Sequence, residues 1–383
     1  MSAEKQEKYD VVIAGAGPAG CACALALKDA GLKVAMLDKE DFPRDKVCGD
    51  AIPGRAIKVL KNISPVFAKA FSDFPKKCGT RKTQLNFKGK QSEFTWVVEA
   101  YTCARMQFDN FLFDLVKKHT NTHILTRHNI AGVDVQEEDV TIQIKNKPSI
   151  TADILVGADG AHSITAKQLT ARMLDRAHHV GSVRAYYKNV TGLQDDTTEL
   201  YFDKRYLPSY LWVFPLPNNV CNVGFGMLSS EIAKRKINIK NTFYDFIKET
   251  PLLAEKFKGA EQISALEGFG LPLGSKRVPM SGDRFLLAGD AASLIDPFSG
   301  DGIGNAMTSG QAAALQIIKC FEAHNFTAAF MQQYDAEVHR KLGKELKTHA
   351  IAQSALSKMP VLLDILFAAT RNKVLKKRLQ KYL

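Results

Sequence analysis

The chain has 383 residues, of which 45% are hydrophobic and 24% are charged, and its formal net charge is +12. This balance is typical of a globular protein with a packed core, and it excludes an intrinsically disordered or collagen-like chain. Because the chain is longer than one hydrophobic core usually supports, we expect two domains and an appendage.

The first residues are polar, and the cysteines follow no regular spacing. Residues 1–8 contain no apolar run, so we expect no secretory signal and a cytoplasmic location. The seven cysteines fit no disulfide framework, iron–sulfur cluster or zinc site, which favours a reducing compartment. The basic residues are spread along the chain without a nucleic-acid-binding signature, so we expect no nucleic-acid partner. Their charge suits a phosphate-bearing ligand or an anionic membrane.

The chain begins with a strand, a helix and a second strand. Asp10–Ala14 predicts a short buried strand, and Lys33–Leu37 predicts another. Pro18–Ala30 predicts a helix, because a proline stands in its first turn and Gly31 follows its end. These elements form one βαβ unit.

The remaining pattern alternates between strand-rich and helical segments. Strands are predicted within Thr83–Tyr101, 124–144, Asp153–Gly157, Val180–Met227 and Arg284–Ala288, and helices over Asp109–His119 and after Gly304. The sequence therefore predicts an α/β protein in which a discontinuous Rossmann-like domain carries an inserted antiparallel β-sheet domain. A C-terminal helical segment follows.

The predicted boundaries divide the chain into six segments. The nucleotide-binding domain comprises residues 1–76, 104–180 and 276–330, the inserted sheet domain comprises 77–103 and 181–275, and the C-terminal helical region is 331–383.

The first glycine cluster lies between the first strand and the first helix. It reads Gly15-Ala16-Gly17-Pro18-Ala19-Gly20. Gly15 permits a tight turn, Gly17 lets the backbone approach a pyrophosphate, and Gly20 lets helix and strand pack closely. Asp38 ends the second strand, where its carboxylate accepts hydrogen bonds from a ribose, and Lys39 follows it. This pattern predicts a bound dinucleotide, either NAD or FAD.

Two further clusters also follow predicted strands. One contains Asp159, and the other contains Gly289, Asp290, Pro297, Gly300, Gly302 and Ile303. Asp290 is suited to bond a polyol chain such as ribityl. The amides of Gly302 and Ile303 begin a predicted helix, where they stabilise negative charge on a reduced flavin ring. Because an NAD enzyme needs neither feature, these clusters favour FAD.

Together the three clusters resemble the class A flavoprotein fold of aromatic hydroxylases, flavin-dependent halogenases and geranylgeranyl reductases, from about Tyr9 to Ala314. The resemblance implies that FAD is bound, with Arg44 and Ile130 among the residues around it. It also implies that Arg105 contacts the flavin dinucleotide, as charge-assisted hydrogen bonds would allow. The alternative for Arg105 is an exposed arginine at a helix end.

The segment Lys46-Val47-Cys48-Gly49 resembles a Lys-x-Cys-Gly sequence that lies beside the flavin in the geranylgeranyl reductase family. The resemblance implies that Cys48 and Gly49 contact the cofactor and that Cys48 takes part in catalysis. Its thiol would position the substrate, protect the reduced flavin or supply a proton. The alternative is a buried structural cysteine.

Tyr210, Trp212 and Phe214 alternate along a predicted strand, so their side chains share one face. Such a face suits the wall of an apolar tunnel for a polyprenyl chain, or an ordinary aromatic core. With Pro215 and the later Gly224-x-Gly226, the segment resembles a signature of the reductase family. The resemblance implies that Tyr210 and Trp212 are catalytic.

The resemblance thus implies an FAD-dependent oxidoreductase acting on CH–CH groups. It would pass hydride from reduced flavin to one alkene carbon of a geranylgeranyl-type isoprenoid lipid, and a proton from Cys48, Tyr210 or water to the other. The alternatives are an FAD-dependent aromatic monooxygenase or halogenase, and a non-enzymatic flavin-binding scaffold. The sequence holds no second dinucleotide fingerprint, so we expect electrons from transiently docked NAD(P)H or from a protein such as reduced ferredoxin. We expect no bound metal.

The last residues, 371–383, contain six basic residues and no acid, interleaved with apolar ones. A basic amphipathic helix rests on an anionic membrane, which predicts a peripheral membrane contact suited to a lipid substrate. A helix packed on the protein with one solvated basic face explains the same pattern.

Overall fold

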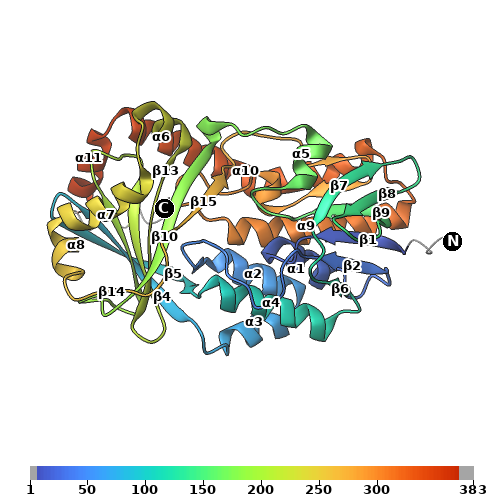
Figure 1. The fold of residues 1–383 in the computed structure, drawn as a ribbon, viewed down its shortest axis with the longest axis horizontal. Helices are drawn as coiled ribbons and strands as arrows, with labels where there is room; N and C mark the ends of the chain where they lie inside the picture. The colour runs from blue at the N-terminus through green and yellow to red at the C-terminus, as the bar shows by residue number, and fades with distance from the viewer. Residues whose placement is uncertain (1–6, 371–383) are drawn as a thin grey trace.

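The computed structural model describes residues 7–370, which form two β-sheets and the helices around them (Figure 1). Sheet A has eight strands, with the order β16-β17-β9-β1-β2-β6 and the β7–β8 pair attached to β9. Sheet B has nine, in the order β14-β10-β13-β12-β11-β4-β5-β3, with β15 also paired to β10. The predicted α/β class is confirmed.

The strands and helices have the following bounds. Sheet A consists of β1 (Lys8–Ala14), β2 (Val34–Leu37), β6 (His123–Leu125), β7 (Ile130–Val135), β8 (Val140–Ile144), β9 (Ile150–Gly157), β16 (Ser281–Gly282) and β17 (Phe285–Leu287). Sheet B consists of β3 (Ala51–Ile52), β4 (Cys78–Phe87), β5 (Lys90–Thr102), β10 (His179–Lys188), β11 (Thr197–Phe202), β12 (Tyr210–Leu216), β13 (Val220–Leu228), β14 (Glu261–Gln262) and β15 (Glu267–Pro272). The helices are α1 (Pro18–Ala26), α2 (Gly54–Ile63), α3 (Pro65–Ser72), α4 (Arg105–His119), α5 (Ile164–Thr170), α6 (Ser229–Arg235), α7 (Ile239–Glu249), α8 (Pro251–Lys256), α9 (Ile303–Ala323), α10 (Ala328–Lys358) and α11 (Val361–Ala369).

The centre of sheet A is parallel. Strands β17, β9, β1 and β2 run side by side, and Ala14 pairs with both Gly157 and Leu37. These strands are apolar along their length because both of their faces are buried in the core around sheet A. Their carboxyl ends lie at one edge, so the three glycine- and acid-containing segments that follow β1, β9 and β17 meet there.

Two predicted helices differ from the observed ones in length. α1 ends at Ala26 rather than Ala30, because residues 27–30 turn before Gly31, whose φ is +68°. α4 begins at Arg105, four residues before the predicted start, and an ion pair joins Arg105 to Asp109 one turn later.

Sheet B is antiparallel except where β11 runs parallel to β4. The prediction of an antiparallel sheet was therefore wrong for this pair. β4 and β11 are not joined by a hairpin, and the long chain between them allows β11 to run in the same direction as β4. β3 pairs with β5, although its residues fall within the predicted first part of the nucleotide-binding domain. The domain boundaries themselves stay a prediction.

The aromatic alternation on β12 separates the two faces of sheet B. Leu211 and Val213 belong to an apolar cluster that also contains Phe243 and Phe246 of α7. Tyr210, Trp212 and Phe214 therefore point to the opposite face, toward the helices and loops of sheet A. An Asn218-Asn219 turn with φ values of +67° and +56° joins β12 to β13, as a tight hairpin requires.

α10 connects the two halves of the molecule (Figure 1). Its residues Tyr334, Val338 and Leu342 are buried in the core around sheet A, whereas Leu356 joins Leu363 of α11 in an apolar cluster on sheet B. Among residues 7–370 no single helix is long and apolar enough to span a membrane, although α10 and α11 together, bent by 113°, meet that criterion of length and composition. The basic segment 371–383 lies outside the described residues.

Candidate functional site

A cavity of about 1740 Å³ lies between the carboxyl edge of sheet A and the inner face of sheet B. Single small-molecule sites are usually about 300 to 1000 Å³, so this cavity has room for two ligands. Every predicted site residue except Gly20 lines it: Gly15, Gly17, Pro18, Ala19, Asp38, Lys39, Arg44, Cys48, Gly49, Arg105, Ile130, Asp159, Tyr210, Trp212, Gly289, Asp290, Pro297, Gly300, Gly302 and Ile303.

The turn between β1 and α1 tolerates only glycine at two positions. A Cβ on Gly15, whose φ is +108°, would lie 2.3 Å from the carbonyl oxygen of Ala158. A Cβ on Gly20 would lie 1.9 Å from the carbonyl oxygen of Gly15. Gly20 thus sets how closely α1 packs on the turn, which is why it lies behind the cavity wall.

Asp38 holds this turn to the end of β2. Its carboxylate accepts hydrogen bonds from the amides of Ala16 at 2.9 Å and Glu40 at 3.0 Å. The side chain is 8% exposed, at the wall of the cavity. A carboxylate oxygen accepts more than one hydrogen bond, so Asp38 retains capacity for a ligand hydroxyl.

Asp109 anchors two arginines beside the turn. Arg105 donates to it through Nε at 2.7 Å and Nη2 at 2.8 Å, and Arg44 donates through Nη1 at 3.0 Å. Burial raises the pKa of the Asp109 carboxyl, but the charges of Arg105, Arg44 and Lys46 outweigh it and hold that pKa below its ordinary value. Arg105 is only 3% exposed, so the alternative of a surface arginine was wrong.

Asp159 serves the start of α5. Its carboxylate accepts from Ser163 Oγ, from Thr165 Oγ1 and from the amides of Ile164 and Thr165, at 2.5 to 3.1 Å. The two amide bonds satisfy two of the unpaired donors at the helix N-terminus, and the two hydroxyl bonds hold the carboxylate in place. The residue lines the cavity while its carboxylate stabilises the helix.

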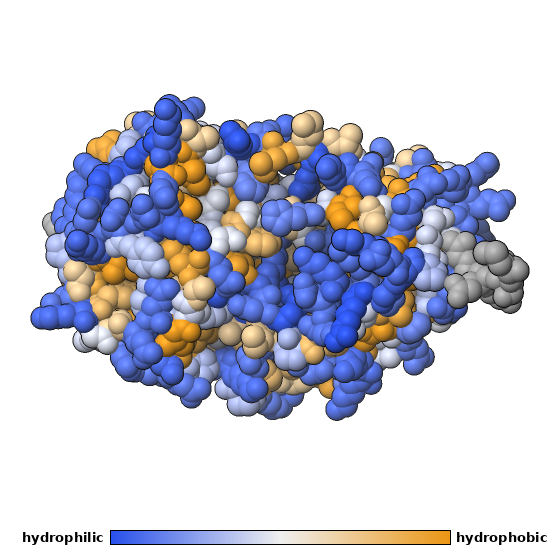
Figure 2. Space-filling view, viewed as in Figure 1, coloured by the Kyte–Doolittle hydropathy of each residue, from blue (hydrophilic) through white to orange (hydrophobic). Residues whose placement is uncertain are grey.

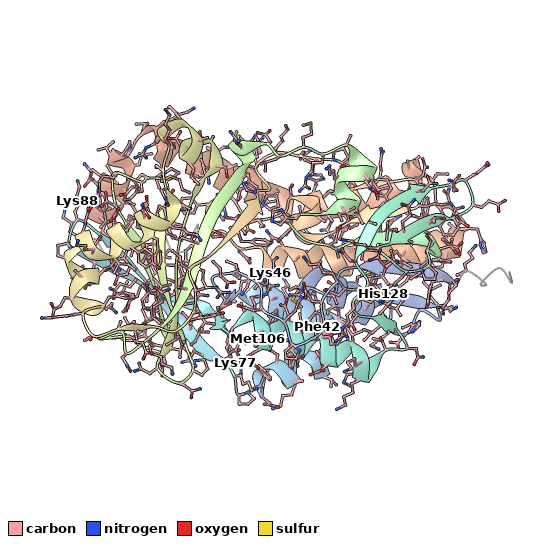
Figure 3. The ribbon with its side chains drawn as sticks, viewed as in Figure 1. Phe42, Lys46, Lys77, Lys88, Met106 and His128 are labelled. Carbon is pink, nitrogen blue, oxygen red and sulfur yellow. The ribbon has the colours of Figure 1, made fainter. Side chains whose placement is uncertain are left out.

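Asp290 faces Lys46 across the cavity. The Lys46 ammonium donates to its carboxylate at 2.9 Å, and Figure 3 shows Lys46 in the middle of the molecule, between the two sheets. Nearby, Gly302 and Ile303 at the start of α9 line the cavity, and the Asp301 carboxylate accepts from the Gly304 amide at 3.3 Å. A helix N-terminus of this kind favours a negatively charged group.

The loop of Pro297 and Gly300 is held by Asp296. This buried carboxylate accepts from the amides of Phe298 and Ser299 and from His349 Nδ1 of α10 at 2.6 Å. The hydrogen bond to Asp296 raises the pKa of His349. Glu345 of α10 lies near both, in a cluster of three possible metal-ligating side chains, and it pairs with Arg55.

The aromatic face of β12 covers the Cys48–Gly49 segment. A Cβ on Gly49 would lie 3.4 Å from the Phe214 ring and 3.5 Å from Trp212 Nε1. On β13, a Cβ on Gly224 would lie 2.1 Å from the Trp212 indole, so this glycine makes room for the ring. Cys48 is half-buried, whereas the other six cysteines are buried, and its role in catalysis stays a prediction.

The Tyr210 hydroxyl donates to the carbonyl oxygen of Ser299 at 2.6 Å. Burial raises the pKa of this hydroxyl above its ordinary value. Tyr210 therefore joins sheet B to the loop before α9 and keeps its proton at neutral pH.

One part of the cavity wall carries a group of apolar side chains, called here the apolar arm. They come from β4, β5, β11, α10, α11 and the loop before α9: Leu85, Phe94, Leu200, Phe202, Phe298, Leu356, Leu362, Leu363 and Leu366. The helix α11 is thus a wall of this arm, and its inward leucines complete the apolar cluster on sheet B.

Two buried residues connect the Cys48–Gly49 segment to α4 and to sheet B, and the sequence analysis did not identify either of them. Asp50 follows Gly49 and accepts from the amide of Arg105 at 3.1 Å and from Tyr186 at 2.9 Å. Asn222 donates to the carbonyl oxygen of Cys48 at 2.7 Å and to Asp50 at 2.8 Å. The available signal was a lone amide side chain inside the apolar run Val220–Phe225.

Comparison with known proteins places this geometry in a family. The family described as "FAD binding domain" matches residues 8–344. Menaquinone reductase of Mycobacterium tuberculosis is 29% identical over 321 residues, covering 80% of this chain and 76% of that protein. Digeranylgeranylglycerophospholipid reductase of Methanococcus vannielii is 27% identical over 357 residues, covering 91% and 87%. The predicted resemblance is confirmed.

Solved structures share the fold. A geranylgeranyl bacteriochlorophyll reductase-like protein from Thermoplasma acidophilum has a TM-score of 0.84 at 23% identity, covering 96% of this chain and 92% of that one. A flavin-dependent brominase has a TM-score of 0.79 at 20% identity, covering 98% and 93%. At these identities the likeness concerns the fold alone.

Proposed function

The chain belongs to the FAD binding domain family, and we propose that it is an FAD-dependent oxidoreductase that reduces carbon–carbon double bonds of a geranylgeranyl-type isoprenoid lipid. The names of the digeranylgeranylglycerophospholipid reductases to which it is similar support this substrate class. The support in the chain itself is the apolar arm of the cavity.

The cavity residues fit FAD. The Gly15–Gly17 turn and Arg44 would hold the pyrophosphate, since Arg44 Nη2 lies 3.7 Å from the Cβ position of Gly17. Asp38 would accept from the ribose hydroxyls and Asp290 from the ribityl chain. The amides of Gly302 and Ile303 would face the ring, where a helix N-terminus stabilises negative charge. When bound, FAD supplies a hydride from its reduced ring.

The observation that carries the proposal is the apolar arm. Its leucine and phenylalanine side chains lie beside Thr83 and Thr198 of the same strands, and burying a hydrocarbon chain among the apolar ones contributes roughly 0.8 kcal/mol for each CH₂ group. An aromatic substrate would need a compact pocket beside the ring and no such extension.

The chain's own residues then orient the alkene and control water. Trp212 and Phe214 lie over Gly49 and would hold the isoprenoid chain against the Cys48 segment. Cys48 lines the cavity, and its thiol is the proton donor that we assign to the second alkene carbon. Tyr210, whose hydroxyl is bonded to the Ser299 carbonyl, closes the loop side of the site and excludes water.

The test is anaerobic photoreduction of the purified protein followed by addition of a geranylgeranyl compound. The proposal expects flavin reoxidation together with a mass gain of two for each bond reduced. Substrate-dependent oxygen incorporation would instead identify a monooxygenase, and halide-dependent turnover of an aromatic substrate a halogenase. Cys48→Ala should impair turnover more than flavin retention.

The electron donor follows from a parallel experiment. We propose NAD(P)H docking transiently or a reduced ferredoxin, and each is mixed anaerobically with the oxidised protein. The donor is the one that bleaches the flavin absorbance within the turnover time. If neither does so, this part of the proposal is wrong.

We also propose a cytoplasmic enzyme in peripheral contact with the membrane. Met359, Val361 and Ile365 are each more than half exposed around α11, beside the wall of the apolar arm, and the basic segment 371–383 follows. The face in Figure 2 is mainly hydrophilic, with apolar side chains in scattered patches. Cosedimentation with anionic vesicles, compared with neutral ones and with a chain ending at residue 370, tests the contact.

A further inference from the structure

The inner face of sheet B carries a polar layer against the segment 45–50. Tyr186 of β10 pairs in register with Asn222 of β13, and Arg184 pairs with Gly224. Trp212 of β12 pairs with the same Gly224 from the other side. Directly paired residues share a face, so these side chains form one layer. Arg184 contacts Asp45, and Tyr186 contacts Asp50, each at 2.8 to 2.9 Å.

Asn222 is the centre of this layer. Its amide nitrogen donates to the Cys48 carbonyl at 2.7 Å and to Asp50 at 2.8 Å, and its oxygen accepts from Trp212 Nε1 at 2.8 Å. Its side chain is fully buried. An asparagine amide has two N–H donors, and here each has a partner in a different direction. One side chain therefore sets the spacing between the Trp212 indole and the Cys48–Gly49 peptide.

Asp50 fixes the orientation of that amide. Its carboxylate only accepts when it is ionised, and it receives the Arg105 amide and the Tyr186 hydroxyl in addition to Asn222. The Asn222 nitrogen rather than its oxygen must therefore face Asp50, and the oxygen is left for Trp212. Asp50 itself has a φ of +63°, a conformation that asparagine and aspartate tolerate best.

We propose that Asn222 is a positioning residue of this enzyme, because it holds the indole wall and the Cys48 segment in register where the flavin and the substrate would meet. The effect of Asn222 on turnover rests on the function proposed above. The effect of Asn222 on the reactivity of the Cys48 thiol does not rest on that function, so the two effects are measured separately.

Two variants separate the contacts. Asn222→Leu removes all three hydrogen bonds and puts an apolar side chain of similar size in the place of the amide. Asn222→Asp keeps the acceptor for Trp212 but loses the donors to Cys48 and Asp50. Asn86→Leu and Asn86→Asp are the matched controls, because Asn86 is also buried in sheet B, on β4, and donates to the Leu200 carbonyl.

The first readout is the labelling rate of Cys48 in the holoenzyme with a chromogenic disulfide reagent. Cys48 is half-buried and the other six cysteines are buried, so it reacts first. Both Asn222 variants free the Cys48 carbonyl, and the labelling rate of the Cys48 thiol should therefore rise at least about tenfold, because the segment loses one hydrogen bond to a buried partner. The Asn86 variants should keep the wild-type rate. Equal rates in wild type and the Asn222 variants would overturn the proposal.

The second readout is reduction of the geranylgeranyl compound. Both Asn222 variants should lose at least about tenfold in kcat with flavin retention kept, as misplaced reacting groups cause. A higher KM alone, or wild-type kcat, would overturn the proposal. If the wild type itself does not reduce the compound, the proposed function is wrong. The positioning role of Asn222 is then tested by the Cys48 labelling rates alone.

The pH dependence of Asn222→Asp gives a third readout. The new carboxylate and Asp50 repel each other, so the pair retains a proton to higher pH than either acid alone. The groups facing Asp50 are Tyr186, Arg184, Cys103 and the Arg105 amide. Thiol labelling slows in acid for every protein, because the thiolate is the reactive form, so each variant is compared with the wild type at the same pH. The retained proton restores one donor in Asn222→Asp, so its labelling rate relative to wild type should fall toward one as the pH falls, whereas that ratio should stay constant for Asn222→Leu. Parallel pH profiles of the two variants would overturn the proposal.

Discussion

Asp109→Asn is the most informative perturbation of the cofactor side of the cavity. The substitution keeps the shape of the side chain but removes the charge that binds Arg105 through two bonds and Arg44 through a third. Asp109 is fully buried and Arg105 is 3% exposed, so the arginine would remain as a buried, uncompensated cation. Breaking a buried ion pair from one side costs about 3 to 5 kcal/mol. Asparagine still accepts one hydrogen bond, so we expect about 3 kcal/mol.

The free energy of unfolding is measured by urea titration without FAD, so that ligand binding does not shift it. Asp114→Asn on the same helix is the control, because Asp114 is exposed and should change stability by no more than about 0.5 kcal/mol. FAD affinity of the folded variant should also fall, since Arg44 loses the anchor that holds it beside the Gly17 turn.

The pH dependence has a definite sign. The folded-state pKa of Asp109 lies below its ordinary value, so its stabilisation is complete above the unfolded pKa of about 3.9 and is lost as the pH falls through the folded pKa. The difference between wild type and Asp109→Asn should therefore shrink below about pH 4. A loss no larger than that of Asp114→Asn, or a difference that persists in acid, would refute the reasoning.

Three other substitutions test the remaining parts of the cavity. Gly224→Ala should displace the Trp212 indole and lower the free energy of unfolding in urea by about 1 to 3 kcal/mol. Gly226→Ala is the control and should lower it less, because its Cβ would lie 3.2 Å from its nearest neighbour. Equal losses in the two variants would contradict the assigned packing. Asp290→Ala should weaken FAD retention on gel filtration by at least about tenfold, and a variant purified with full flavin would remove this role. Leu366→Trp should block the apolar arm and slow turnover of a geranylgeranyl compound. Ala368→Trp, at an exposed position of the same helix, should not, and the same turnover in both would exclude this path for the chain.

Local patterns were sufficient for the turns and for the face of β12. The glycine positions after β1 are dictated by backbone approach within a few residues, so the spacing of Gly15 and Gly20 predicted the turn. The alternation of Tyr210, Trp212 and Phe214 likewise predicted one shared face, because neighbouring side chains on a strand point in opposite directions. These signals lie within short stretches of sequence.

Arg105 marks the limit of such reasoning. An arginine four residues before an aspartate is the pattern of an exposed helical ion pair as much as of a buried one. The structure buries the pair, because α4 packs against α1 beneath the first turn. The spacing of two residues along a helix does not indicate which other element packs against that face of the helix.

The sequence by itself determined the strand–turn–helix units, the dinucleotide turn and the aromatic strand, since each depends on residues close together in the chain. Only the tertiary structure decided that Lys46 meets Asp290, that Asn222 reaches Cys48 and that α11 walls the apolar arm. Contacts between residues 174 or 244 positions apart leave no periodicity in the chain, because they depend on how the two sheets pack against each other.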